Sequence, residues 1–186
     1  PGIRGLMTIR AEGHFFQSVH DLSPESGYRT ADDQTGSIGN YYDLPYRFVG
    51  QPDQVAIVGA GSGNDVAAAI RAEAGHVDAV EIDPAIFQLG AYYHPESPYS
   101  DSRVNVVIDD ARSFFRSAEH PYDLIVYGLL DSHILLNQAS SLRIDSYVYT
   151  VEGLREARSR LDEDGVMSLT FAMISDEIGR KMYLMM

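Results

Sequence analysis

The sequence predicts an α/β domain built on a doubly wound, mostly parallel sheet. From Gln54 onward, short apolar runs alternate with helical patterns, as they do in βαβ units that form parallel sheets with right-handed crossovers. The run DLIVYGLL (123–130) lacks polar alternation, which is expected when helices cover both faces of a sheet. A glycine-rich turn follows the first apolar run, and Rossmann-like domains bind their ligands at such turns.

The predicted strands and helices follow one another along the chain. Pro84 suits the first turn of a helix, where its missing N–H is not needed. The expected strands are Val55–Val58, Val77–Ile82, Val104–Ile108, Tyr122–Leu130 and Gly165–Phe171. The expected helices are Asn64–Ala74, Pro84–Tyr92, Ala111–Ala118 and Tyr147–Leu161, with a further helix starting near the end of the chain.

The first fifty residues differ in character from the rest. They are rich in glycine, tyrosine and turn residues, and short alternating stretches at Leu6–Arg10, Phe15–His20 and Gly27–Thr30 are typical of small strands. Ala31–Asn40 has the composition of turns and loops. We therefore divide the chain into a β-rich N-terminal extension, 1–50, and a Rossmann-like ligand-binding domain, 51–186.

Composition narrows the classes of partner. The chain has 27 acidic and 14 basic residues, a net charge of −13, and no cysteine. This argues against nucleic acids and anionic membranes, which need basic surfaces, and it excludes disulfides and thiolate zinc sites. A small neutral or cationic substrate fits, and so does a merely solubilising acidic surface. We expect a cytoplasmic protein, or the soluble domain of a longer, membrane-tethered one.

A carboxylate follows the glycine-rich turn at the spacing of a nucleoside site. Gly59, Gly61 and Gly63 allow the backbone to turn sharply and to approach a ligand, although a plain tight turn explains them equally well. Glu81 ends the second strand about 20 residues later, where an acidic side chain accepts hydrogen bonds from ribose hydroxyls. Asp83 should point to the opposite face and cap the next helix.

Two further strand ends carry polar residues. Asp109 or Asp110 could accept from an adenine amine, cap the helix beginning near Ala111, or do both. The fourth strand end leaves Tyr127 and Asp131 over the crevice, with Ser132 and His133 beside them. Asp131, Ser132 and His133 are adjacent in the chain, and adjacent residues cannot easily adopt the geometry of a Ser–His–Asp hydrolase triad. The six histidines show no metal-ligand spacing, so we expect no metal.

The same signatures also occur in nicotinamide-binding enzymes. Those enzymes prefer G-x-G-x-x-G, but position 64 is Asn, so the third glycine falls one residue early. Carboxylates after the second and third strands favour an adenosyl ligand with a sulfonium, namely S-adenosylmethionine or a close relative.

Taken together, the ordered segments resemble the spermidine/spermine synthase family and class I methyltransferases more broadly. The matching segments are GAGSGND (59–65), VEIDP (80–84), DDA (109–111), YDLIVYGLLDS (122–132), Y-T-x-E (149–152) and RLDEDGVMSL (160–169). The resemblance implies binding of decarboxylated S-adenosylmethionine or methylthioadenosine. It assigns the ribose to Glu81, the adenine amine to Asp110, and the amine substrate to Asp131. The predicted cofactor-binding residues are Gly59, Gly61, Gly63, Glu81, Asp109, Asp110 and Ala111; the predicted catalytic residues are Tyr127 and Asp131.

Two positions depart from the family pattern. Gly128 stands where the family has the aspartate that helps to deprotonate the amine, and Ser62 stands where it has an aspartate near the sulfonium tail. The leading hypothesis is therefore a methyltransferase acting on a small-molecule acceptor. The alternatives are a polyamine aminopropyltransferase and a catalytically idle, nucleoside-binding domain of a larger protein.

The end of the chain raises a question of assembly. Class I methyltransferase sheets normally carry two more strands, whereas this chain ends about fifteen residues after Phe171. The segment Val166–Phe171 would then form an unprotected sheet edge. We expect residues 1–50 to cover it, or a second copy to pair with it in a two-fold homodimer.

Overall fold

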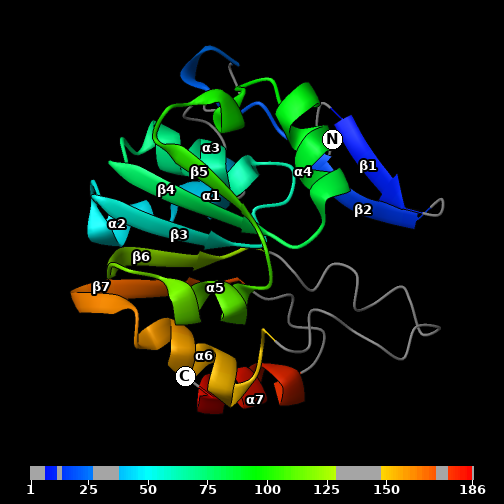
Figure 1. Cartoon of the computed structure of the whole chain (residues 1–186). Helices are drawn as coiled ribbons and strands as arrows, with labels where there is room; N and C mark the ends of the chain where they lie inside the picture. Colours follow the sequence, from blue (N-terminus) through cyan, green and yellow to red (C-terminus); the bar gives the residue numbers. More distant parts are fainter. Residues whose placement is uncertain (1–6, 12–13, 27–37, 129–147, 171–175, 186) are drawn as a thin grey trace.

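The computed structural model describes residues 7–11, 14–26, 38–128, 148–170 and 176–185. Its centre is a five-stranded parallel sheet in the order β5-β4-β3-β6-β7 (Figure 1). The strands are β3 (Gln54–Val58), β4 (His76–Glu81), β5 (Val104–Ile108), β6 (Tyr122–Tyr127) and β7 (Leu161–Leu169). The predicted doubly wound Rossmann-like fold is thereby confirmed.

Helices cover both faces of this sheet, and each face has its own apolar core. On one face, Val55 and Ile57 of β3 pack with Val66 of α3. On the other, Val58 packs with Phe115 of α5 and Leu154 of α6. The helices are α1 (Ile38–Asp43), α2 (Tyr46–Val49), α3 (Asn64–Arg71), α4 (Pro84–Tyr93), α5 (Ala111–Ser117), α6 (Val151–Arg158) and α7 (Asp176–Met185), with 3-10 turns η1 (Pro24–Ser26) and η2 (Pro98–Ser100). In the described part of the chain, no helix combines the length and apolarity needed to span a membrane.

Most predicted boundaries lie within a few residues of the observed ones, but α6 and β7 differ more. The helix α6 begins after Thr150, whose Oγ1 accepts a hydrogen bond from Gly153 N at 3.0 Å. The strand β7 starts at Leu161, four residues earlier than expected, because its pairing with β6 shifts register before Val166. A Cβ on Gly165 would lie 2.7 Å from Tyr122 O. The chain thus has a glycine inside an irregular strand, whereas the sequence analysis placed the start of the strand at this glycine.

The N-terminal hairpin packs away from the β7 edge. Strands β1 (Met7–Ala11) and β2 (His14–Val19) pair antiparallel, and Ile9 and Val19 pack against Ile86 of α4. Figure 1 shows this blue hairpin beside α4, far from β7. The expectation that the extension covers the β7 edge is therefore wrong for the hairpin. The homodimer and the division at residue 50 stay predictions.

The helix α4 lies directly on the glycine-rich turn, so we expect Gly90→Ala to destabilise the fold strongly. A Cβ on Gly90 would lie 2.4 Å from the backbone O of Ser62, and overpacking of this kind costs up to about 3 kcal/mol. Ala91→Ser is the matched control, because Ala91 is the next residue of α4 and is exposed. This small change should cost less than about 1 kcal/mol. Thermal unfolding of both variants measures the difference, and equal losses would contradict the close packing.

Candidate active site

The carboxyl ends of β3 and β6 meet where the strand order reverses. The chain leaves β3 toward β4 on one side and returns to β6 on the other. Gly128, which follows β6, donates its N–H to Val58 O at 3.0 Å, so it lies directly beside the glycine-rich turn that starts at Gly59. In open α/β sheets such a reversal point forms the ligand crevice.

The glycine-rich turn requires its glycines for conformation and for packing against the protein itself. Gly59, Gly61 and Gly63 have φ of 70°, 56° and 100°, a region that side chains disfavour. A Cβ on Gly61 would lie 2.8 Å from Gln17 Oε1, and one on Gly63 would lie 2.9 Å from Pro98 Cγ. These two glycines therefore allow the hairpin and η2 to approach the turn.

The Glu81 carboxylate lies against the same turn. Its Oε2 accepts a hydrogen bond from Gly61 N at 2.8 Å, and its Oε1 accepts from Asp83 N at 2.9 Å. The residue is only 8% exposed. Burial raises the pKa of Glu81, and the backbone N–H donors partly oppose that rise. Because a carboxylate oxygen has two lone pairs, each oxygen can still accept a ligand hydroxyl.

The carboxylates after β5 lie next to this position. Asp109 donates its backbone N–H to Glu81 O at 3.2 Å. Asp110 caps α5, because its Oδ1 accepts from the backbone N–H groups of Arg112 and Ser113 at 3.0 and 3.1 Å. Asp83 likewise caps α4 through Ala85 N at 2.8 Å, as expected. Asp110 remains only partly buried and Asp109 is exposed, and both stay candidates for an adenine amine. Ala111, the first residue of α5, is buried.

Of the two predicted catalytic residues, only Tyr127 lies in the described part of the chain. Tyr127 lies in the core on the α5 and α6 face, 1% exposed. Burial raises the pKa of its phenol well above the usual value, so the group keeps its proton. Asp131, together with Ser132 and His133, lies outside the described residues, and its role stays a prediction.

The structure adds a carboxylate that the sequence analysis missed. Asp65 stands in the first turn of α3, and a Cβ on Gly128 would lie 3.1 Å from its Oδ2 and 3.0 Å from Gly59 O. The Asp65 carboxylate therefore fills the space into which a side chain at position 128 would extend.

The protonation of Asp65 is unusual. Burial raises its pKa to about 7, with a smaller opposing effect from its own backbone N–H. The N-terminus of α3 also favours the ionised form, but desolvation is the larger effect. No ion pair with Asp65 occurs in the described ranges. The residue as a whole is partly exposed.

The N-terminal hairpin contributes a second residue that sequence reasoning missed. Gln17 Oε1 accepts a hydrogen bond from Ser62 N at 3.0 Å. Asn64, noted only as a departure from the glycine pattern, holds the same hairpin: its Oδ1 accepts from His20 N at 3.1 Å and its Nδ2 donates to Ser18 O at 2.8 Å. The alternation in Phe15–His20 indicated a strand but not which element it would contact.

The sequence contains two tyrosine pairs that could stack on adenine, Tyr41–Tyr42 and Tyr92–Tyr93, and the structure places them in different surroundings. The Asn64 amide donates to the Tyr42 hydroxyl at 3.1 Å, so that phenol lies close to the glycine-rich turn. Tyr92 and Tyr93 lie on the outer side of α4, 80% and 53% exposed.

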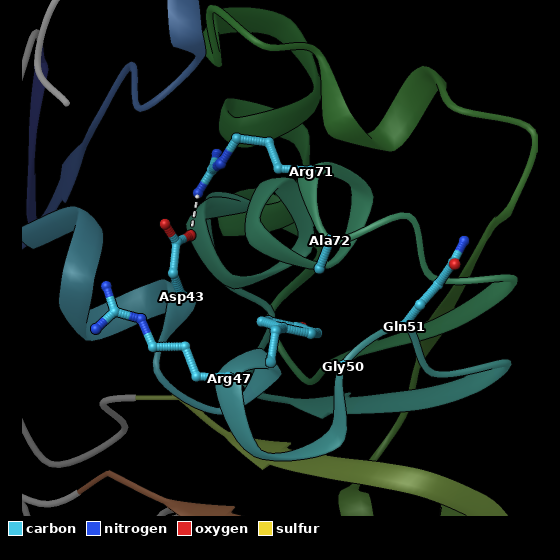
Figure 2. Close-up of a pocket in the computed structure, with 7 residues that line it drawn as sticks. Asp43, Arg47, Gly50, Gln51, Arg71 and Ala72 are labelled. Carbon is cyan, nitrogen blue, oxygen red and sulfur yellow. Dashed lines mark hydrogen bonds and ion pairs between the residues drawn. The ribbon is translucent and has the colours of Figure 1, made fainter.

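A separate pocket of about 280 Å³ lies at the opposite edge of the sheet. It is formed by α2, the C-terminal end of α3 and the segment leading into β3 (Figure 2). Arg71 at its wall forms an ion pair with Asp43 at 3.3 Å. None of the predicted site residues lines this pocket.

Comparison with known proteins agrees with this geometry. A family model that describes the spermine/spermidine synthase domain matches residues 42–175 of the chain. A polyamine aminopropyltransferase of Korarchaeum cryptofilum is 29% identical over 119 residues, which cover 62% of this chain and 34% of that protein. The chain thus spans about a third of the length of this curated relative.

Solved structures share the fold. A spermidine synthase in complex with the transition-state analogue AdoDATO superposes with a TM-score of 0.57 at 20% identity, covering 69% of this chain and 44% of that one. Human methyltransferase-like protein 13 in complex with SAH gives 0.57 at 19% identity, covering 78% and 68%.

Proposed function

Since the chain belongs to the spermine/spermidine synthase domain family, we propose that it binds decarboxylated S-adenosylmethionine and transfers the aminopropyl group to an amine. The sequence alone favoured methyl transfer. The relatives reverse that order, because a polyamine aminopropyltransferase is among them. The activity of the whole protein is part of the proposal, because the chain spans only a third of that relative.

The acceptors at the carboxyl edge suit an adenosyl ligand. Ribose hydroxyls and the adenine amine are hydrogen-bond donors, and Glu81, Asp109 and Asp110 offer carboxylate oxygens side by side at the ends of β4 and β5. Glu81 would hold the ribose, and Asp109 or Asp110 the adenine amine. The bound molecule supplies a carbon activated by its attachment to a positively charged sulfur.

The observation that carries the proposal is the position of Asp65 beside Gly128. The family pattern expects a carboxylate at the end of β6, and Gly128 has none. Asp65, coming from α3, brings a carboxylate to the same point. Because amines are cationic at neutral pH, a carboxylate there can bind the ammonium group of the acceptor.

Asp65 can also take a proton from that acceptor. An ammonium group must lose a proton before its nitrogen can form a new bond to carbon. Burial raises the pKa of Asp65 to about 7, which makes it a stronger base than an ordinary carboxylate and matches it to neutral pH. Transfer of one ammonium proton to Asp65 leaves a neutral amine with its lone pair free to attack.

Methyl transfer from S-adenosylmethionine is the second candidate. The departure at Ser62 favours it, because this residue is fully buried and its hydroxyl carries no negative charge that could bind an aminopropyl ammonium. Methyl transfer needs mainly approach geometry and desolvation.

A transfer assay separates these candidates. The purified chain is incubated with a panel of diamines and polyamines and with either decarboxylated S-adenosylmethionine or S-adenosylmethionine. We expect amine-dependent release of methylthioadenosine from the first donor only. Formation of S-adenosylhomocysteine from the second donor alone would support the methyl candidate. Binding of both donors without either product would support an idle nucleoside-binding domain, and both of these results would contradict the proposal.

A further inference from the structure

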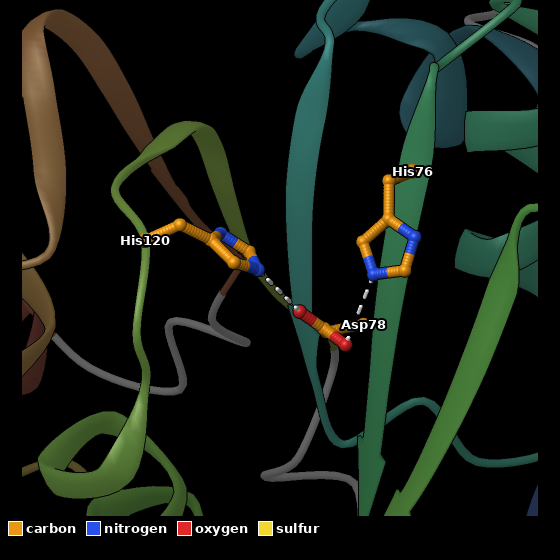
Figure 3. Close-up of side chains that lie close together, drawn as sticks. All are labelled: His76, Asp78 and His120. Carbon is orange, nitrogen blue, oxygen red and sulfur yellow. Dashed lines mark hydrogen bonds and ion pairs between the residues drawn. The ribbon is translucent and has the colours of Figure 1, made fainter.

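Two histidines and an aspartate lie close together at the amino ends of β4 and β6, at the opposite end of the sheet from the crevice. His76 begins β4, Asp78 follows two residues later, and His120 lies just before β6 (Figure 3). Their three ligand atoms lie within 4.8 Å of one another. The spacing of the histidines does not indicate this group, because His120 is distant in the chain from the other two. Their proximity arises from the positions of β4 and β6 on either side of β3.

Asp78 is a buried carboxylate held by neutral donors. Its side chain is 5% exposed. The Tyr122 hydroxyl donates to Oδ2 at 2.8 Å, and the Asn105 amide donates to Oδ1 at 2.7 Å. These two bonds fix the orientation of the carboxylate, as hydrogen bonds commonly do for carboxylates that ligate metals.

The two imidazoles approach the Asp78 carboxylate at longer distances than these two donors, and only His76 is within hydrogen-bonding distance. His76 Nε2 lies 3.3 Å from Oδ1, and His120 Nε2 lies 3.7 Å from Oδ2. The second distance is too long for a hydrogen bond. No arginine or lysine forms an ion pair with Asp78 anywhere in the described ranges. Buried carboxylates are normally paired with a cation or bound to a metal. The Asp78 carboxylate has no such permanently charged partner close by in the described ranges.

We propose that His76, Asp78 and His120 bind one divalent transition-metal ion of the Zn²⁺ type. Two imidazole nitrogens and a carboxylate oxygen are ligands that Zn²⁺ accepts, whereas Mg²⁺ and Ca²⁺ prefer oxygen alone. A water molecule would complete a tetrahedron.

The three side chains can reach that geometry with little movement. Ligand atoms in a zinc tetrahedron stand roughly 3.3 Å apart. The His76 and His120 side chains are 37% and 42% exposed, so both rings have room to rotate toward the ion, and Asp78 stays in place. The ion would tie the start of β4 to the segment before β6. Glu81 ends the same strand, so the metal site lies a strand length from the crevice.

Titration of the metal-free chain with Zn²⁺ and with Co²⁺ tests this site. We expect one ion per chain and visible absorption of tetrahedral Co²⁺. Zn²⁺ at a hundred times its Kd should raise the Tm by roughly 5–10 °C. Mg²⁺ should neither bind nor compete.

Variants identify the ligands. His76→Gln and His120→Gln remove exposed ligand atoms, and each should weaken Zn²⁺ binding roughly 100-fold or more while the chain stays folded. Glu119→Gln is the matched control: it removes an exposed charge next to His120 and should leave the affinity unchanged. A parent chain that binds no Zn²⁺, or a His76/His120 double variant that binds it as tightly as the parent, would overturn the proposal.

Discussion

Asp65→Asn is expected to lower kcat for transfer by about 10²–10⁴-fold, the range that a positioned base contributes. The asparagine preserves the shape beside Gly128 but can neither neutralise an ammonium group nor accept its proton. The parent rate should rise with pH through about 7, where Asp65 loses its proton. Initial rates of methylthioadenosine release from pH 5.5 to pH 8.5 measure both effects. A variant with parental kcat and the same pH profile would eliminate Asp65 as the base.

The same substitution should stabilise the folded chain at high pH. Between about pH 4 and pH 7, folded Asp65 holds a proton that the unfolded chain has released. The folded state binds more protons there, so its stability falls as the pH rises through this window. Partial exposure and the α3 terminus reduce the effect, and we expect Asp65→Asn to gain about 2 kcal/mol at pH 8. The gain should vanish near pH 4.

Denaturant unfolding at pH 4.5 and pH 8 measures this difference. Asp162→Asn is the matched control, because Asp162 is an exposed carboxylate on β7 and should leave the pH dependence as in the parent. If Asp65→Asn were no more stable than the parent at pH 8, Asp65 would be ionised without cost, and its suitability as a base near neutral pH would be lost.

Glu81→Gln is expected to weaken binding of adenosyl compounds by roughly 10–100-fold, because a hydrogen bond to a charged acceptor contributes about 1.5–3 kcal/mol. The amide keeps the size of the side chain. It replaces a charged acceptor that lies against Gly61 N, at the centre of the crevice. Calorimetric titration with methylthioadenosine measures the loss.

Asp83→Asn provides the control for Glu81. Asp83 caps α4 through Ala85 N, and an asparagine can make the same cap. Its affinity for methylthioadenosine should equal that of the parent. Similar losses in Asp83→Asn and Glu81→Gln would mean that any disturbance of the β4 end weakens binding, and would remove Glu81 as the specific ribose ligand.

The sequence predicted the sheet well because its strands are local and strongly patterned. Val104–Ile108 was predicted with its observed bounds, and β3, β4 and β6 were located to within a few residues. Runs buried on both faces leave few alternatives to a parallel strand. The cap of α4 was also predictable from neighbouring residues, because the Asp83 carboxylate accepts a hydrogen bond from Ala85 N, two residues further along the chain. The proximity of the glycine-rich turn and Glu81 could be predicted because the turn follows β3 and Glu81 ends β4, the neighbouring parallel strand.

The missed features depend on residues that only the fold brings together. Asp65 is an ordinary first-turn acid of α3 by its local pattern, and its proposed role depends on Gly128, which follows β6. Gln17 lies on a hairpin whose docking site no periodicity encodes. The irregular start of β7 depends on the close approach of Gly165 to Tyr122. In each case the local pattern is compatible with several partners, and packing selects one.

An adenosyl group is expected to bind through Glu81 in the crevice at the carboxyl ends of β3 and β4. Calorimetric titration of the parent chain with decarboxylated S-adenosylmethionine, methylthioadenosine and NAD, repeated with Glu81→Ala, measures this binding. We expect saturable 1:1 binding of the two adenosyl sulfur compounds, none of NAD, and a marked loss of affinity in the variant. Absence of binding by every adenosyl compound, or equal affinity in the Glu81→Ala chain, would contradict it.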